Sequence, residues 1–164
     1  MESLWTPWRM PYIQENKSRR DCLFCELLTA ADGRRHILYE GRDAFLILNR
    51  YPYTAGHIMA IPYRHVASFQ PLRPAELEEL LGLAVRGERA LVRAYGCHVV
   101  HGGVNVGRCA GAGVEGHVHI HLVPRRPGDV ARSRRESGRR DPPEPLDVTY
   151  RRLKAALEQD DSAS

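Results

Sequence analysis

The chain has 164 residues, of which 43% are hydrophobic, and a formal net charge of +4. This length suits a single compact domain and is too short for a (β/α)8 barrel. No apolar run approaches the roughly 20 residues that cross a bilayer, so we expect no membrane segment. The modest positive charge suits a small anionic ligand but does not by itself predict binding to nucleic acid.

The two ends of the chain differ in composition from its middle. Residues 1–21 contain two tryptophans and lack the long apolar centre of a signal peptide. We interpret them as an aromatic arm, packed on its own domain or on a second subunit, and expect a cytoplasmic protein. Residues 126–164 form an arginine-rich extension, with a short helix expected over Thr149–Gln159. Because no aromatic platform for stacking bases accompanies these arginines, we interpret them as a solvated surface.

Residues 22–125, between these ends, carry the pattern of a folded domain. A short helix is expected over Glu26–Ala31, where Asp32-Gly33 ends it. Apolar or alternating runs, separated by turn residues, predict five strands. These strands are His36–Tyr39, Ala44–Leu48, His57–Ile61, Val99–Val106 and His117–Val123.

One long helix is predicted between the third and fourth strands. Pro71 and Pro74 introduce it, and Gly96 stands where a helix commonly ends. Its apolar residues recur at steps of three and four, so they should cover one face of the sheet. These residues are Leu77, Leu80, Leu81, Ala84, Leu91, Val92 and Tyr95.

The last predicted strand carries a row of histidines, His117, His119 and His121, which alternate with aliphatic residues. Side chains two residues apart share one face of a strand, so the imidazoles should line one face and the aliphatic residues the other. The glycine-rich run Gly107–Gly116 leads into this strand and offers backbone N–H groups to an anion. Histidines beside an anion cradle predict a catalytic site.

Two other interpretations of this row remain open. The histidines would bind a catalytic metal, or they would be solvated side chains without chemistry. His117 and His121 are too far apart on a straight strand to share one ion, which counts against the metal. His57, alone at the start of the third strand, is interpreted as an ordinary polar residue in preference to one that helps to shape the ligand loop.

The histidine row and the segments around it resemble the histidine triad (HIT) superfamily. The hallmark of that family is His-x-His-x-His followed by two apolar residues, and His117–Val123 matches it at every position. Leu48–His65 is similar to the strand, loop and strand that precede the long helix of the family. Leu4–Met10 is similar to the opening of bacterial members described as diadenosine tetraphosphate phosphorylases. The likeness covers residues 22–125, which we interpret as a HIT domain.

The resemblance implies a fold and a chemistry. The family fold is α+β, a five-stranded antiparallel sheet with one long helix and short flanking helices, usually paired into a homodimer. Its members transfer or hydrolyse nucleotides through a covalent nucleotidyl-histidine. By this likeness His119 is the nucleophile, His121 contacts phosphate, and His117 orients the site or binds metal. We expect an adenine dinucleoside polyphosphate such as diadenosine tetraphosphate as the substrate. A HINT-like purine nucleoside phosphoramidase and a non-catalytic nucleotide sensor are the alternatives.

The resemblance also implies which residues bind the nucleotide. Asn49 matches the position that contacts the ribose, and Asn105 lies where the family places a residue beside the phosphate. Gly111 and Gly113 belong to the loop whose backbone N–H groups would face the phosphates. Many family members carry glutamine or serine near Gly113, whereas this chain has no polar side chain there. Backbone N–H groups or the side chain of Arg108 are the candidate replacements.

Two cysteines suggest a metal beside this chemistry. Cys22 and Cys25 have the spacing of a zinc knuckle, although two ligands do not complete a tetrahedral site. Family members with this Cys-x-x-Cys take a histidine before the long helix and the first triad histidine as the other ligands. Those positions here are His65 and His117. The resemblance therefore implies a structural zinc, while a redox pair and ordinary packing are the other interpretations of the cysteines.

Overall fold

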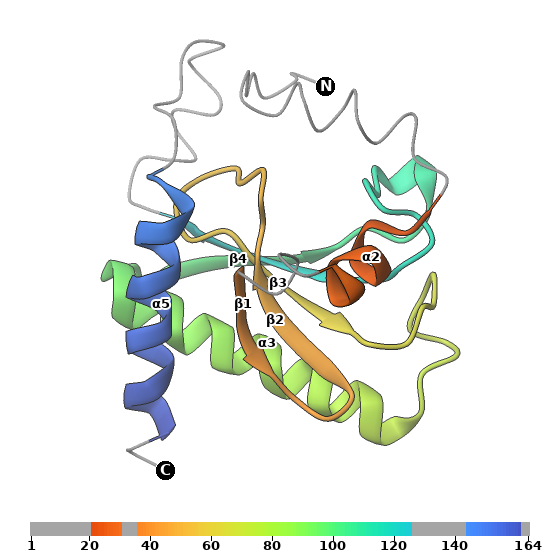
Figure 1. The fold of residues 1–164 in the computed structure, drawn as a ribbon, viewed down its shortest axis with the longest axis horizontal. Helices are drawn as coiled ribbons and strands as arrows, with labels where there is room; N and C mark the ends of the chain where they lie inside the picture. The colour runs from red at the N-terminus through yellow and green to blue at the C-terminus, as the bar shows by residue number, and fades with distance from the viewer. Residues whose placement is uncertain (1–20, 31–35, 126–143, 162–164) are drawn as a thin grey trace, which may run out of the picture.

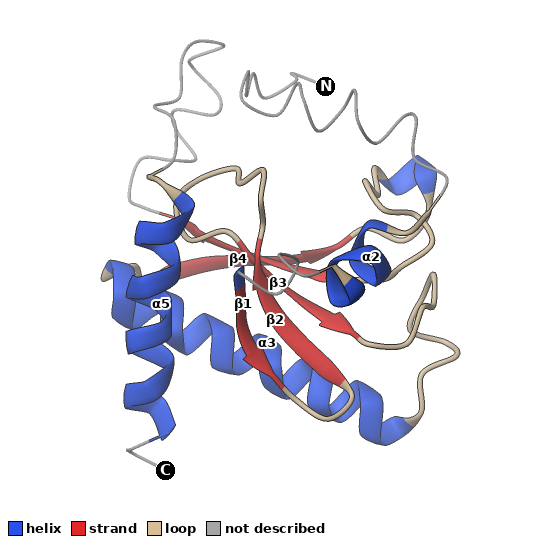
Figure 2. Ribbon diagram, viewed as in Figure 1, coloured by secondary structure: helices blue, strands red, loops and turns tan. Residues whose placement is uncertain are grey.

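The computed structural model describes residues 21–30, 36–125 and 144–161 (Figure 1). The predicted aromatic arm and the larger part of the arginine-rich extension lie outside these residues. The described residues form one sheet with helices packed against it (Figure 2). The elements are α2 (Leu23–Thr29), β1 (Ile37–Glu40), β2 (Ala44–Leu48), β3 (Ile58–Pro62), α3 (Pro74–Tyr95), β4 (Val99–Val104), the 3-10 turn η3 (Arg108–Ala110), β5 (Ile120–Arg125) and α5 (Leu146–Asp161).

Neighbouring strands of the sheet are antiparallel, in the order β1-β2-β3-β5-β4. β2 and β3 are buried along their whole length, as continuous apolar runs between turn residues predict. β4 lies at one edge and pairs, among the described strands, with β5. This confirms the predicted α+β fold with a five-stranded antiparallel sheet.

The two ends of α3 follow simple local rules. Pro74 occupies the first turn, where a missing N–H leaves no hydrogen bond unmade. The Glu76 carboxylate reaches back and accepts the N–H of Arg73 at 2.6 Å, which satisfies one donor of the helix start. Gly96 ends the helix with a φ of 58°, a left-handed conformation that glycine adopts without strain. The predicted bounds of the helix are confirmed.

The apolar stripe of α3 was predicted only in part. Leu80 and Leu91 are buried against the sheet, but Leu81 and Val92 are 49% and 38% exposed. Each exposed residue directly follows a buried one, and one residue step turns a helix by about 100°, away from the sheet. The prediction that Leu81 and Val92 cover the sheet was therefore wrong, and they lie on the outer side of α3.

The opposite face of the sheet carries a second, smaller core beneath α2 (Figure 1). Phe24 is the buried residue of α2, and only 1% of it is exposed. It packs with Phe45 and Ile47 of β2. The ring centroids of His117 and His119 lie 5.4 and 5.0 Å from that of Phe24, in edge-to-face contact. The histidine row therefore faces α2, on the side of the sheet away from α3.

The histidine row begins before the strand that was predicted to carry it. β5 starts at Ile120 rather than at His117. The N–H of Val118 donates at 2.7 Å to the carbonyl of Val66, which lies in the loop after β3. The backbone there is held by a loop instead of by the ladder of the sheet. β4 ends at Val104, earlier than predicted, and other predicted bounds shift by a few residues, as element ends commonly do.

The short terminal helix was predicted, but its packing was not. α5 packs against α3 and β1 (Figure 1). Leu153 and Leu157 of α5 are buried in the main core, and Arg93 of α3 donates to the carbonyl of Ala156 at 2.9 Å. Residues 146–161 therefore belong to the core of the fold. Among the described residues, no helix combines the length and the apolarity that crossing a bilayer requires.

Candidate active site and metal centre

His117 is fully buried, and its two ring nitrogens have different partners. Nε2 lies 2.8 Å from the carbonyl oxygen of Pro62, which can only accept, so Nε2 carries the ring proton. Burial lowers the pKa of His117 and favours this neutral form. The unprotonated Nδ1 faces sulfur, 3.4 Å from Cys22 Sγ and 3.7 Å from Cys25 Sγ. His117 is thus prepared to be a ligand through Nδ1.

Four potential ligands meet here, namely Cys22, Cys25, His65 and His117, with ligand atoms within 4.8 Å of one another. His65 Nδ1 lies 3.4 Å from Cys25 Sγ. A tetrahedral zinc, with Zn–S of about 2.3 Å and Zn–N of about 2.05 Å, would hold sulfur and nitrogen about 3.6 Å apart. The sulfur–nitrogen distances of 3.4, 3.4 and 3.7 Å fit that geometry. The cluster can hold a metal ion, and it unites the four ligands that the resemblance implied.

Three segments far apart in the sequence supply these ligands. Cys22 precedes α2 and Cys25 lies in its first turn, while His65 follows β3 and His117 precedes β5. All four positions of a tetrahedral ion would be filled by protein atoms. That pattern is typical of a structural site, because a catalytic zinc keeps a position for water or substrate.

His119 is buried to 3% exposure, and its ring orientation is set by the backbone. Its Nδ1 lies 2.8 Å from the carbonyl oxygen of His117, so Nδ1 carries the proton and donates it. Nε2 is then unprotonated and nucleophilic. Burial lowers the pKa of His119, which keeps the ring neutral near pH 7.

His121 receives a different set of contacts, in which His57 takes part. The backbone N–H of Tyr53 donates to His57 Nδ1 at 3.1 Å, so the ring proton of neutral His57 sits on Nε2. That Nε2 lies 3.0 Å from His121 Nδ1 and donates to it. The proton of neutral His121 is then on its Nε2. The network assigns these tautomers, and it prepares His121 to donate from Nε2.

His57 is the site residue that sequence reasoning missed. It was interpreted as an ordinary polar residue, yet only 1% of it is exposed and it holds His121. The signal was available in the pair Gly56-His57 directly before β3, within the segment that resembles the family. The contact itself depends on the pairing of β3 with β5, which places Met59 opposite His121 and His57 on the same face.

Asn49 lies at the same corner of the site. Its Oδ1 accepts the N–H of Tyr51 at 2.9 Å, which fixes its amide nitrogen toward His57. That nitrogen is 3.3 Å from His57 Nε2. Both atoms are donors in the assigned tautomer, so this is a packing contact rather than a hydrogen bond. The end of β2 thus brings Asn49 beside the pair His57 and His121.

The glycine-rich loop contains the 3-10 turn η3 and leads from β4 to the histidine row. Gly107 and Gly111 have φ values of 80° and 83°, which only glycine adopts readily. Arg108, a candidate replacement for the missing polar side chain, is 86% exposed and pairs with Glu115 at 3.0 Å. Its guanidinium is thus held across the loop by a carboxylate. Asn105 is half-buried at the end of β4, before this loop.

Comparisons with known proteins agree with this geometry. A HIT domain family model matches residues 31–128. The AP-4-A phosphorylase of Mycobacterium tuberculosis is 33% identical over 138 residues, which cover 79% of this chain and 71% of the relative. An uncharacterised HIT-like protein of the same organism is 32% identical over 144 residues, 87% of this chain and 97% of the relative. The crystal structure of a zinc-bound histidine triad family protein from Mycobacterium smegmatis superposes with a TM-score of 0.71 at 30% identity, covering 91% of this chain and 99% of that one. The chain therefore belongs to the HIT family of nucleotide hydrolases and transferases.

Proposed function

We propose that the protein cleaves adenine dinucleoside polyphosphates, such as diadenosine tetraphosphate, through a covalent nucleotidyl intermediate on His119. One observation carries the proposal, the 2.8 Å hydrogen bond from His119 Nδ1 to the carbonyl of His117. It leaves the lone pair on Nε2, where a nucleophile for phosphorus needs it. The relative named AP-4-A phosphorylase supports this class of substrate.

In the first half-reaction, His119 Nε2 forms a bond to the α-phosphorus, and the bond from phosphorus to the bridging oxygen breaks. With diadenosine tetraphosphate, ATP leaves with the electron pair of that oxygen. The modified ring keeps its Nδ1 proton and becomes cationic, and the carbonyl of His117 stabilises this charge. His121 Nε2–H donates to an oxygen that gains negative charge, because its Nδ1 is already occupied by His57.

In the second half-reaction, an acceptor oxygen attacks the same phosphorus and the nitrogen–phosphorus bond breaks. The electron pair returns to His119 Nε2, which restores the starting tautomer. Inorganic phosphate as the acceptor gives ADP, and water gives AMP. The name of the phosphorylase relative favours phosphate.

The nucleotide itself is proposed to lie between Asn49 and the glycine-rich loop. Asn49 is already oriented by the N–H of Tyr51 and would contact the ribose. Asn105 and the backbone N–H groups of Gly111 and Gly113 would face the phosphates, since such groups bind anions without a charged side chain.

A zinc ion held by Cys22, Cys25, His65 and His117 is part of the proposal, and the zinc-bound structural neighbour supports it. When bound, zinc would supply a fixed tetrahedral centre and no Lewis acid to the reaction. The residues of this chain do the rest. His117 binds through its side chain, while its carbonyl orients His119. The metal centre would therefore stabilise the backbone on which the nucleophile depends.

We also propose a homodimer, in which the outer side of α3 meets a second copy. Leu81, Val85 and Val92 are 49%, 47% and 38% exposed on that side. Val99 of the edge strand β4 is 59% exposed. Exposed apolar residues that gather on one side of a helix are typical of a protein interface.

Product analysis with diadenosine tetraphosphate tests the proposed activity. ADP and ATP formed only with inorganic phosphate would indicate phosphorolysis, and AMP and ATP without it would indicate hydrolysis. If diadenosine tetraphosphate stays intact while adenosine phosphoramidate is cleaved, the protein is a phosphoramidase and the proposed activity is wrong. Nucleotide binding without turnover of either compound would leave the sensor.

A further inference from the structure

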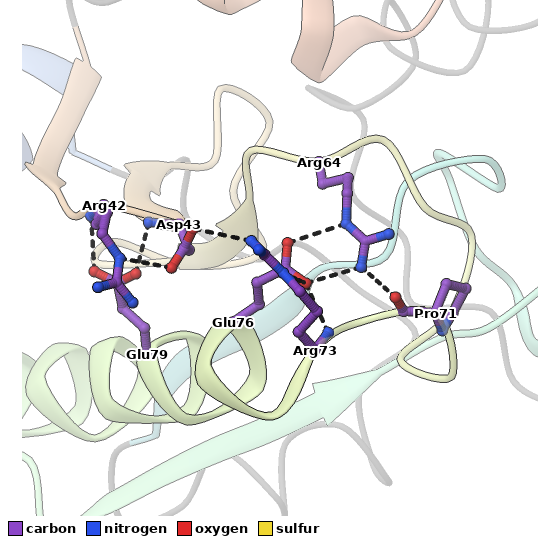
Figure 3. A network of polar contacts seen from close by, with 7 residues as sticks. All are labelled: Arg42, Asp43, Arg64, Pro71, Arg73, Glu76 and Glu79. Atoms are coloured by element: carbon purple, nitrogen blue, oxygen red, sulfur yellow. Dashed lines mark hydrogen bonds and ion pairs between the residues drawn. The ribbon is translucent and has the colours of Figure 1, made fainter.

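A polar network joins the loop that carries His65 to the start of α3 (Figure 3). Glu76 lies at its centre and is 3% exposed. The Glu76 carboxylate accepts from Arg64 Nε at 3.0 Å and from Arg64 Nη2 at 2.8 Å. It also accepts the N–H of Arg73 at 2.6 Å. These hydrogen bonds, those of Arg64 first, hold the pKa of Glu76 at about 2, well below its usual range.

Arg64 directly precedes the metal ligand His65. Its guanidinium binds both oxygens of the Glu76 carboxylate and also donates to the carbonyl of Pro71. One side chain therefore ties the beginning of the loop between β3 and α3 to its end. A two-pronged bond between guanidinium and carboxylate fixes orientation as well as distance. The backbone next to His65 is held by this pair.

His65 needs such support because burial gives it little. It is the exposed member of the four ligands. Its ring meets the edge of the His117 ring, with centroids 5.2 Å apart, and lies beside Gly116, where an added Cβ would make ordinary van der Waals contact with Nε2 at 3.4 Å. The next residue, Val66, is tied to Val118 through its carbonyl. A ligand on an exposed loop loses more conformational entropy on binding unless its backbone is already fixed.

We propose that Arg64 and Glu76 are positioning residues for the metal ligand His65, which hold its Nδ1 beside Cys25 and His117 before the ion binds. The buried pair acts on one side of His65 and the Val66–Val118 hydrogen bond on the other. The inference rests on the proposed zinc centre and adds to it a second layer of residues. Hydrogen bonds made directly to ligating side chains commonly change metal affinity by one to two orders of magnitude, so for residues that act through the backbone beside His65 we expect the lower end of that range.

The same helix offers a matched control one turn further along. Glu79 accepts the N–H of Arg42 at 2.7 Å and that of Asp43 at 2.6 Å (Figure 3). It therefore holds the turn between β1 and β2, and none of these residues adjoins a metal ligand. Glu76→Gln and Glu79→Gln remove the same charge from the same helix but loosen different loops.

The test measures zinc affinity of the full chain by competition with a chromophoric chelator, with thermal unfolding followed alongside. Glu76→Gln is expected to bind zinc about tenfold more weakly, and Glu79→Gln to stay within about twofold of the original protein. Arg64→Lys keeps the positive charge but loses the bidentate hydrogen bonds to Glu76. The zinc affinity of this variant should therefore fall between those of the two glutamate variants. This variant also carries the test if Glu76→Gln does not fold.

Each outcome separates this inference from the zinc proposal on which it rests. Equal zinc affinity for the original protein, Glu76→Gln and Arg64→Lys would leave the zinc centre standing and overturn the positioning role. Equal losses in Glu76→Gln and Glu79→Gln would show a general effect on stability, and would overturn it as well. An original protein that binds no zinc would remove the metal centre and this inference together.

Discussion

The two ends of the histidine row, the proposed metal end at His117 and the proposed catalytic end at His121, hold the same side chain through different ring nitrogens. At the proposed metal end, His117 Nε2–H donates a hydrogen bond to the carbonyl of Pro62, and Nδ1 faces two thiols. At the catalytic end, His121 accepts from His57 at Nδ1, which leaves the proton on Nε2. Between them, His119 donates from Nδ1 to a backbone carbonyl. The nitrogen that the protein occupies decides whether a histidine is prepared as a ligand, a nucleophile or a donor.

The comparison also shows that the two ends are joined. The side chain of His117 belongs to the candidate metal cluster, and its carbonyl oxygen accepts a hydrogen bond from His119 Nδ1–H. A change in the ligands around His117 should therefore alter the orientation of His119, because the carbonyl of His117 holds the His119 ring. A change at His57 should leave the Nδ1 hydrogen bond of His119 in place and act through the neighbours of His57, above all the proton that His121 carries.

The largest effect is expected from removal of the nucleophile. His119→Ala should lower kcat by about 10⁴-fold or more, because the covalent route is lost, while AMP binding remains measurable by calorimetry. His101→Ala, an exposed histidine of β4, is the control and should retain full activity. Turnover that persists in His119→Ala would show that another group attacks phosphorus.

The second-largest effect is expected from removal of a ligand at the proposed metal site. Cys25→Ser should abolish stoichiometric zinc and lower kcat by about tenfold to a hundredfold, since ligand loss frees the segment that orients His119. Metal analysis and steady-state kinetics measure the two effects. Cys109→Ser changes an exposed cysteine outside the cluster and should alter neither quantity. Unchanged zinc content in Cys25→Ser would remove this residue from the ligand set.

Substitution of His57 should lower kcat by an amount that depends on the leaving group of the substrate. His57→Leu removes the contact to His121 and should lower kcat by about a hundredfold with diadenosine tetraphosphate. The p-nitrophenyl ester of AMP has a leaving group that needs little proton donation, so the deficit should shrink with it. His57→Gln offers an amide N–H near the position of Nε2 and should recover part of the rate. An equal deficit with both substrates would indicate a packing role for His57.

The proposed interface gives a further test away from both ends. Val85→Glu would bury a charge at both copies of the α3 contact and should weaken a homodimer at least about tenfold, as sedimentation would show. Arg151→Glu reverses an exposed charge on α5 and should leave association unchanged. A protein that sediments as a monomer before any substitution would contradict the dimer.

The smallest effect concerns stability in acid. The hydrogen bonds from Arg64 lower the pKa of Glu76 from 4.5 to about 2. A depressed carboxylate pKa stabilises the fold fully above the unfolded value, and this contribution is lost as pH falls from 4.5 to about 2. The difference in unfolding free energy between the original protein and Glu76→Gln should therefore shrink across that window. A difference that stays constant with pH would show that the ionised carboxylate contributes nothing.

Local patterns predicted the fold better than they predicted the contacts of the site. β2 was predicted with its observed bounds, since an apolar run between turn residues is a local signal. The start of β5 was not, because alternation shows which way side chains point but not whether the Val118 N–H bonds to a strand or a loop. Leu81 was assigned to the wrong side of α3 for a similar reason. Apolar residues cover a wide arc of this helix, and their spacing alone does not show which part of that arc faces the sheet.

The site shows the same limit. The resemblance supplied Cys22, Cys25, His65 and His117 as one ligand set, and the structure brings them together. His57 and Glu76 were not foreseen, because their roles arise from partners far along the chain. A glutamate in the first turn of a helix is a familiar capping signal, but its burial against Arg64 appears only when the loop has folded.

The most direct measurement is to trap the protein during turnover and locate the nucleotide by mass spectrometry. Rapid quenching in alkali preserves a bond between phosphorus and imidazole nitrogen, and peptide sequencing then identifies the modified residue. We expect an AMP adduct on His119 while diadenosine tetraphosphate is being consumed. Consumption of substrate with no adduct, or with the adduct on another residue, would contradict it.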